Sequence, residues 1–114
     1  MRAMAVACAV AAALAVAGAA SACEVRADVR SFSKDEFNIL HVVFVVDARC
    51  DRGGGCSGEL AYEVLRRGDG RESRSTGAAS WSASQSGSAS AQAEVPMLPG
   101  EEVTGVYVTS VTCR

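Results

Sequence analysis

The stretch Phe37–Ala48, "FNILHVVFVVDA", decides the fold class of this 114-residue chain. It is nearly all apolar, and its valines and isoleucine are β-branched residues, which favour strands over helices. A continuous apolar run of this length is typical of a strand that is buried on both faces. The sequence therefore predicts a central strand over residues 37–48 with both faces covered.

Four further segments are predicted as strands. Residues 71–76 follow the "GDG" as the returning strand of a hairpin, and residues 102–113 are rich in residues that favour strands. Residues 23–30 and 58–67 alternate apolar and polar residues with period two. In "GELAYEVLRR", this alternation places Leu60, Tyr62 and Val64 on one face. The "GDG" at 68–70 and the "LPGEE" at 98–102 are turn signals, and no segment shows helical periodicity with caps. Strands at about ten-residue spacing, separated by turns, predict an all-β chain with a small β-sandwich fold.

The serine-rich stretch "SWSASQSGSASAQ", residues 80–92, fits either a flexible linker or a strand. Only about twenty residues follow it, and they include a strand and a cysteine that must return to the fold, so a disordered tether is disfavoured. Serine at every second position matches the period of a strand, and Trp81 can anchor one face on the core. We predict a strand over residues 80–85, and a strand or mobile edge over residues 86–93.

Residues 1–22 have the composition of a secretory signal peptide. Arg2 precedes a long uncharged apolar run that ends in the small residues "ASA". We expect cleavage near Ala22, an exported protein, and a single domain over residues 23–114. The alternative is that "ASAC" is a bacterial lipobox with Cys23 lipidated, although the third residue before this cysteine is alanine rather than a larger aliphatic residue.

The charge of the expected mature chain argues against nucleic acid as a partner. It has 92 residues (114 − 22) and loses Arg2, so ten lysines and arginines face thirteen acidic residues, a net charge near −3. Nucleic-acid binding would require a dense basic field, which this balance does not supply. A domain of this size buries a modest core and often depends on covalent cross-links.

The mature chain contains four cysteines: Cys23, Cys50, Cys56 and Cys113. An even number in an exported domain predicts two disulfides, for which three pairings exist. Cys50 and Cys56 flank the turn-like loop "DRGGG", so a local Cys50–Cys56 bridge is sterically easy. That bridge leaves Cys23–Cys113 to join the first and last strands.

Other chemistry fits these residues poorly. A zinc site would have to combine a six-residue cysteine spacing with the single, distant His41. A redox pair is usually a C-x-x-C at the start of a helix, whereas Cys50 and Cys56 are separated by a longer loop between predicted strands. No pattern places a nucleophile and an orienting partner beside His41. We therefore expect no metal, no cofactor and no enzymatic activity.

The predicted hairpin around residues 68–70 is rich in charge. It carries four arginines: Arg66, Arg67, Arg71 and Arg74. One interpretation is a solvated hairpin whose charges protect an edge strand from pairing with other chains. The other is a locally positive surface that attracts an acidic or polar partner. Asp69 and Glu72 interrupt the arginines, and both interpretations can hold for one hairpin.

Residues 37–112 resemble the curli assembly chaperones, the CsgC/CsgH-like group of small periplasmic amyloid inhibitors. The resemblance consists of an apolar strand, a cysteine-bearing turn, "YEVLRRGDGRESRS", then "SASQSGSASA", then "LPGEEV" and a final strand. It implies an immunoglobulin-like β-sandwich of about seven strands, located in the periplasm and lacking a cofactor. Some members carry a C-x-C pair, which differs from Cys50 and Cys56 here, so a redox role for that pair does not transfer.

The resemblance also implies a function. We expect a monomeric periplasmic chaperone that binds an amyloid-forming secreted subunit and inhibits premature fibre assembly. The expected contacts are the four arginines of the hairpin together with Ser84 and Gln85, whose segment "SQSGSASAQ" is compositionally close to curli-type repeats. The alternative is a secreted or lipid-anchored module that binds the cell envelope or an adhesion partner, without chaperone activity.

Overall fold

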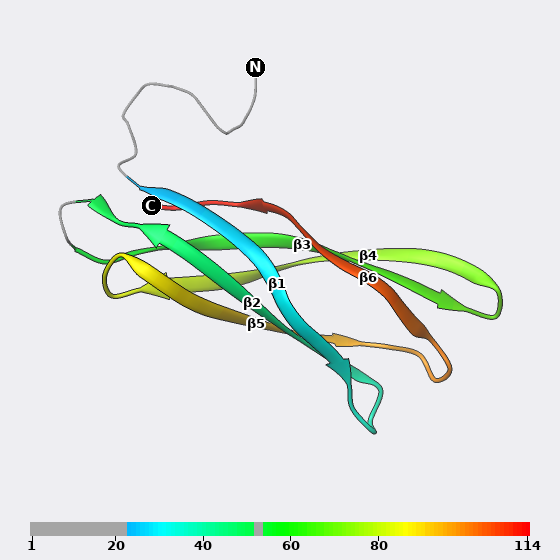
Figure 1. Cartoon of the computed structure of the whole chain (residues 1–114). Coiled ribbons are helices and arrows are strands. Elements are labelled where there is room, and N and C mark those ends of the chain that lie inside the picture. Colours follow the sequence, from blue (N-terminus) through cyan, green and yellow to red (C-terminus); the bar gives the residue numbers. More distant parts are fainter. Residues whose placement is uncertain (1–22, 52–53) are drawn as a thin grey trace, which may run out of the picture.

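The computed structural model describes residues 23–51 and 54–114, and the proposed signal peptide lies outside them. The described residues form six strands and no helix (Figure 1). The strands are β1 (Glu24–Lys34), β2 (Ile39–Arg49), β3 (Cys56–Gly68), β4 (Arg71–Ala83), β5 (Gly87–Pro96) and β6 (Glu102–Val111). Within the described residues, no helix is long and apolar enough to cross a membrane.

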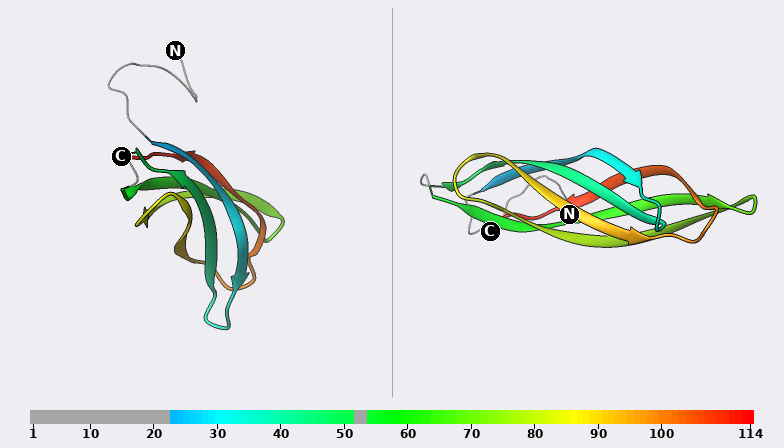
Figure 2. Two further views of the ribbon diagram at one scale, coloured as in Figure 1. Left: turned by 60° about the vertical axis from the view of Figure 1, so that its left-hand side comes forward. Right: turned by 90° about the horizontal axis from the view of Figure 1, so that it is seen from below.

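The strands form two antiparallel sheets of three strands each, in the orders β1-β2-β5 and β4-β3-β6. The sheets lie face to face, so that β1 neighbours β6 and β5 neighbours β4 at the two sides (Figure 2). This arrangement confirms the predicted β-sandwich. It has six strands rather than about seven because the segments predicted at 71–76 and 80–85 belong to one strand, β4.

The central strand β2 is buried on one face only. Leu40, Val42, Phe44 and Val46 are at most 1% exposed, whereas the alternate residues of β2 are partly exposed. The expectation that both faces are covered was therefore wrong for the outer face. A sandwich of two layers covers each antiparallel sheet from one side, and solvent meets the other.

The core lies between the two sheets, and β3 contributes to it the face that its alternating sequence predicted. Leu60, Tyr62 and Val64 are buried, and the Tyr62 ring lies 5.4 Å from that of Phe44 between ring centroids. Trp81 is 3% exposed and confirms its predicted role as an anchor for β4. Its indole N–H donates a hydrogen bond to the carbonyl of Thr112, 3.0 Å away, which ties β4 to the end of the chain.

The serine-rich stretch forms parts of two strands that belong to opposite sheets. β4 ends at Ala83, β5 begins at Gly87, and the three residues between them cross from one sheet to the other (Figure 1). Ser86 holds this crossing in place, because its hydroxyl accepts a hydrogen bond from the Cys50 N–H at 2.7 Å and donates one to the Cys50 carbonyl at 3.3 Å. Ser84 and Gln85, expected in a strand, lie in this turn.

Both predicted disulfides, Cys50–Cys56 and Cys23–Cys113, are present. The sulfur atoms of Cys23, Cys56 and Cys113 lie within 4.8 Å of one another, so the two bridges meet at one end of the sandwich. As disulfide sulfurs they are not the thiolates that zinc binds. The Cys50–Cys56 bridge connects the two sheets, and the Cys23–Cys113 bridge joins the ends of the domain.

Candidate partner-binding surface

The β3–β4 hairpin forms the end of the molecule opposite the disulfides (Figure 1). Asp69 and Gly70 have φ angles of 53° and 74°, so the two-residue turn has the positive φ values of a type I′ hairpin turn. A turn of this type matches the twist of its flanking strands. The β3–β4 register then continues without a shift from Gly68–Arg71 to Cys56–Ala83, which fixes where each arginine lies.

Arg66 has a structural role. Its guanidinium forms an ion pair with Glu101 at 3.1 Å, and both side chains are mostly buried, at 17% and 12% exposure. The same guanidinium donates to the Ser75 hydroxyl at 2.9 Å and to the Pro96 carbonyl at 3.4 Å. Arg66 therefore links the β3–β4 hairpin to the turn between β5 and β6, and its guanidinium makes three hydrogen bonds within the fold.

Glu101 completes this link from the side of the turn. One of its carboxylate oxygens accepts a hydrogen bond from the Leu98 N–H at 2.8 Å. This hydrogen bond is the main cause of a lowered pKa for the Glu101 carboxyl, and the Arg66 guanidinium lowers the pKa further. The turn therefore keeps Glu101 ionised and paired.

The other three arginines lie at the surface of the hairpin. Arg67 pairs with Glu72 at 2.7 Å, and this hydrogen-bonded pair raises the pKa of the Arg67 guanidinium. Arg74 lies 3.4 Å from a carboxylate oxygen of Glu63, and 66% of the Arg74 side chain is exposed. Among the described residues, Arg71 has no ion pair. The hairpin thus offers three exposed guanidinium groups, two of them in surface ion pairs that exchange easily with a partner.

The remaining predicted contacts, Ser84 and Gln85, lie at the other end of β4. They follow the last residue of a strand that begins at Arg71, so they are separated from the hairpin turn by the whole strand, roughly 40 Å at about 3.3 Å per residue. The structure therefore does not bring all the predicted residues together. A partner can contact both groups only if it extends along this side of the sandwich.

A cluster around His41 had not been predicted. Its Nε2 lies 2.7 Å from a carboxylate oxygen of Asp35, and its Nδ1 lies 3.5 Å from one of Glu94. The other Asp35 oxygen accepts hydrogen bonds from the N–H groups of Phe37 and Ile39. Asp35 and His41 lie on either side of the turn between β1 and β2. The available signal in the sequence was a carboxylate six residues before its single histidine.

This cluster stabilises the turn between β1 and β2. The hydrogen bond from His41 is the main cause of the lowered pKa of Asp35, followed by the one from the Ile39 N–H. In the described part of the chain, His41 has no hydrogen bond to a hydroxyl or thiol nucleophile. Within these same ranges, no polar or charged residue is as fully buried as the apolar core.

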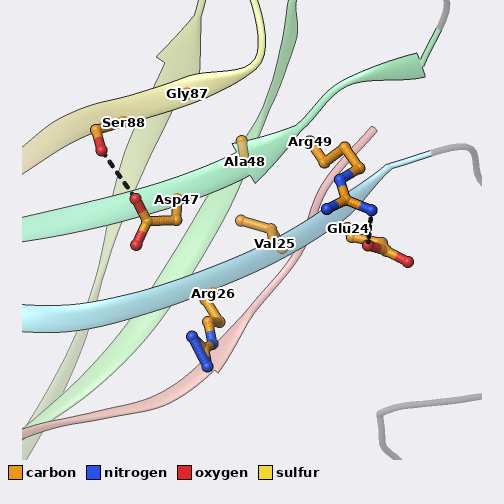
Figure 3. A pocket seen from close by; sticks show the side chains of 8 residues that line it. All are labelled: Glu24, Val25, Arg26, Asp47, Ala48, Arg49, Gly87 and Ser88. Carbon is orange, nitrogen blue, oxygen red and sulfur yellow. Dashed lines mark hydrogen bonds and ion pairs between the residues drawn. The ribbon is translucent and has the colours of Figure 1, made fainter.

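A shallow depression of about 470 Å³ lies at the disulfide end of the β1-β2-β5 sheet (Figure 3). Its lining combines both signs of charge. Glu24 lies 3.5 Å from Arg49, and the Ser88 hydroxyl donates to Asp47 at 2.8 Å. Among the described residues, Arg26 is the one charged side chain of this lining without an ion pair, and the other charged side chains are paired with neighbours. The depression therefore does not bring several free polar groups to one point, as a site that selects a ligand would.

The chain matches no protein-family model, no curated protein and no solved structure. Its surface includes a rigid hairpin end with exposed guanidinium groups and, along the sides of the sandwich, four strands that each lie at the edge of a sheet.

Proposed function

We propose that this protein is an exported, disulfide-bonded β-sandwich that binds an amyloid-forming secreted subunit and delays its assembly into fibres, without catalysis. The observation that carries the proposal is the β3–β4 hairpin, where Arg67, Arg71 and Arg74 are exposed at the end of a rigid sandwich. A guanidinium has five N–H donors and no acceptor. It can therefore bind backbone carbonyls and side-chain amides of an extended polar chain.

Such contacts are weak and reversible. Surface ion pairs of arginine contribute little to stability, so exchanging a carboxylate for a partner's oxygen has a small energetic cost. The carboxylates of Glu63 and Glu72 beside the arginines also keep the local charge from becoming strongly positive. A binder of this kind delays assembly by repeated short encounters, so less than one molecule per subunit is sufficient.

A chaperone of amyloid subunits must not join the fibre itself, and the edge strands fit that requirement. β1 carries alternating charges and a register shift between Val29 and Ser31, and both features disfavour pairing with another chain. β4 begins with Arg71, Glu72 and Arg74. The two disulfides keep the strands of the fold from being released as new strand donors.

The periplasm is the proposed location. Two disulfides are compatible with an oxidising compartment outside the cytosol. The resemblance of residues 37–112 to the curli assembly chaperones and the composition of residues 1–22 support the same assignment. A lipid anchor on Cys23 would require the sulfur atom that the Cys23–Cys113 bridge uses.

A second candidate function is a module that binds the cell envelope or an adhesion partner. It is favoured by two exposed apolar side chains at neighbouring turns, Phe37 at 77% and Leu98 at 66% exposure. The Met97 N–H donates to the Asn38 carbonyl at 2.8 Å, which holds these two turns together. If this second function holds, replacing Phe37 and Leu98 with serine should abolish binding to the cell envelope. If the chaperone function holds instead, the same replacement should leave the inhibition of fibre formation unchanged.

The deciding experiment measures fibre formation by a curli-type subunit with the disulfide-bonded protein added well below equimolar amounts. The wild type should lengthen the lag phase, and R67E/R71E/R74E should lose most of this effect. The control R26E/R30E/R49E changes the net charge by the same amount on the opposite sheet, where all three arginines are exposed, and should retain it. No delay by a folded wild-type protein would refute the proposal.

A further inference from the structure

Among the described residues, four strands lie at the edge of a sheet, and three of them have features that disfavour pairing with another chain over at least part of their length. β1 has alternating charges, β4 has charges over its first residues, and β6 pairs with β3 through two register shifts. β5 has none of these features before its last three residues. It has no charge before Glu94, no proline before Pro96, and a continuous register with β2.

The backbone groups on the open side of β5 can be assigned. The Met97 N–H donates to the Asn38 carbonyl, and this pair comes directly after Ile39–Pro96 in the β2–β5 register. In an antiparallel ladder, residues whose N–H and C=O face the partner strand alternate with residues whose groups face away. Counting back from Met97, the groups that face away from β2 belong to Ser88, Ser90, Gln92 and Glu94.

No other strand uses these groups. Within residues 23–51 and 54–114, β5 lies at the edge of its sheet and has no backbone hydrogen bonds to a further strand. Pro96 has no N–H, so the series of outward donors ends at Glu94. Residues 88–94 therefore present a row of donors and acceptors that matches an added strand of about seven residues.

The side chains of β5 define the chemistry of that strand. Ser88, Ser90 and Gln92 are exposed on the outer face and can form cross-strand hydrogen bonds with hydroxyl or amide side chains. Ala89 and Ala91 face the interior and leave no pocket for a large side chain. A charged residue placed opposite them would lose water without gaining a partner.

We propose that the open edge of β5 binds an extended, uncharged segment of a protein partner, rich in serine, glycine, glutamine and similar small or amide residues, as an added strand. This inference rests on the proposed function, because it identifies which segment of the amyloid subunit is held and where. The binding mode is β-strand addition, in which main-chain hydrogen bonds supply the affinity. Occupying such a segment removes it from the growing fibre.

A partner segment fits this edge better than a second copy of the chain. Two rigid copies meeting at β5 would touch mainly along residues 88–94, where most side chains are serine and alanine. Such a contact is small beside the roughly 1,000 Å² that a specific interface between folded proteins needs. A flexible segment can also fold over the outer serine and glutamine side chains. Two copies with net charges near −3 repel each other as well.

The test is residue-resolved amide hydrogen exchange of the disulfide-bonded protein. The probe is a synthetic ten-residue peptide with blocked ends, composed only of serine, glycine, glutamine and alanine. Exchange at Ser88, Ser90 and Gln92 should slow by about tenfold or more when the peptide is present, because added-strand hydrogen bonds protect amides. Ala89 and Ala91 should not change, because their N–H groups already face β2.

This alternating pattern is specific to strand addition at β5. Unchanged exchange at β5, or slowing along β1 or β4 instead, would overturn the inference. Slowing that occurs without peptide and grows with protein concentration would show that a second copy occupies the edge, and would overturn the assignment to a partner.

A matched pair of variants gives a second test. S90P removes one outward N–H and leaves the ladder to β2 intact, which an edge strand tolerates. S80P makes the same change on β4, where counting from the Gly68–Arg71 pair also gives an outward N–H. S90P should abolish the protection by peptide, and S80P should retain it. The reverse result would overturn the inference, and Trp81 fluorescence verifies that both variants are folded.

Fibre kinetics separate this inference from the proposed function. If the wild type fails to delay fibre formation, the proposed function fails, whatever the peptide does. If the wild type delays fibre formation and S90P delays it equally, the function stands and the β5 site is wrong.

Discussion

Removing the Cys23–Cys113 disulfide should destabilise the protein about twice as much as removing Cys50–Cys56. The bridges close chain segments of very different length, with sequence separations of 90 and 6 residues. In the chain-entropy description, a cross-link stabilises the fold by restricting the unfolded chain, and the effect grows with the logarithm of loop length. This gives roughly 4.6 kcal/mol for the long loop and roughly 2.2 kcal/mol for the short one.

The assay is urea unfolding of C23A/C113A and C50A/C56A at one pH, with mass spectrometry to verify the remaining bridge. Cys50 and Cys56 are only 6% and 8% exposed, so their replacement also loses some packing, about 1 kcal/mol at most. The order of the two variants should survive that correction. An equal or larger loss of unfolding free energy for C50A/C56A would refute the loop-entropy reasoning and show that the short bridge stabilises the native state directly.

Two further predictions concern the strands and the turn cluster. G58A should reduce the unfolding free energy by about 3 kcal/mol or more, because a Cβ at this position would clash with the Thr112 carbonyl oxygen. G54A should have little effect, because the atom nearest to its added Cβ, the Asp51 carbonyl oxygen, lies 3.9 Å away. Equal urea midpoints for the two variants would contradict this prediction. The lowered pKa of Asp35 means that its stabilising contribution is complete above its ordinary pKa of 3.8 and is lost as the pH falls through the folded-state value. D35N should therefore lie below the wild type in thermal midpoint at neutral pH and approach it in acid, and a gap that stays constant with pH would contradict the assignment.

The predictions made from the sequence held where a local pattern carries the information. Alternation in β3 identified Leu60, Tyr62 and Val64 as the buried face, because period two is a property of any strand with one covered side. The disulfide pairing followed from loop length and from the positions of the first and last strands. Trp81 was predicted as an anchor since a single large apolar residue in a serine-rich strand has one face to bury.

Other features depended on contacts that the sequence does not show. Residues 77–79 lie between two of the predicted strands, yet β4 runs through them. At Gly77 a Cβ would lie 2.5 Å from the Tyr62 hydroxyl oxygen. Glycine is present there for packing rather than for a turn. Arg66 was grouped with its neighbours, but its partner Glu101 is 35 residues away in the chain, and the pairing of β3 with β6 brings them together.

The two proposed contacts lie along one side of the sandwich, which gives them a physical connection. β5 runs from the disulfide end toward the β5–β6 turn, and the Pro96 carbonyl at its end lies 3.4 Å from the Arg66 guanidinium. A segment added to β5 therefore ends next to the hairpin that carries Arg67, Arg71 and Arg74. Its continuing chain would reach those exposed guanidinium groups directly. Main-chain pairing along β5 can then select an uncharged segment, while the arginines hold whatever polar chain follows it.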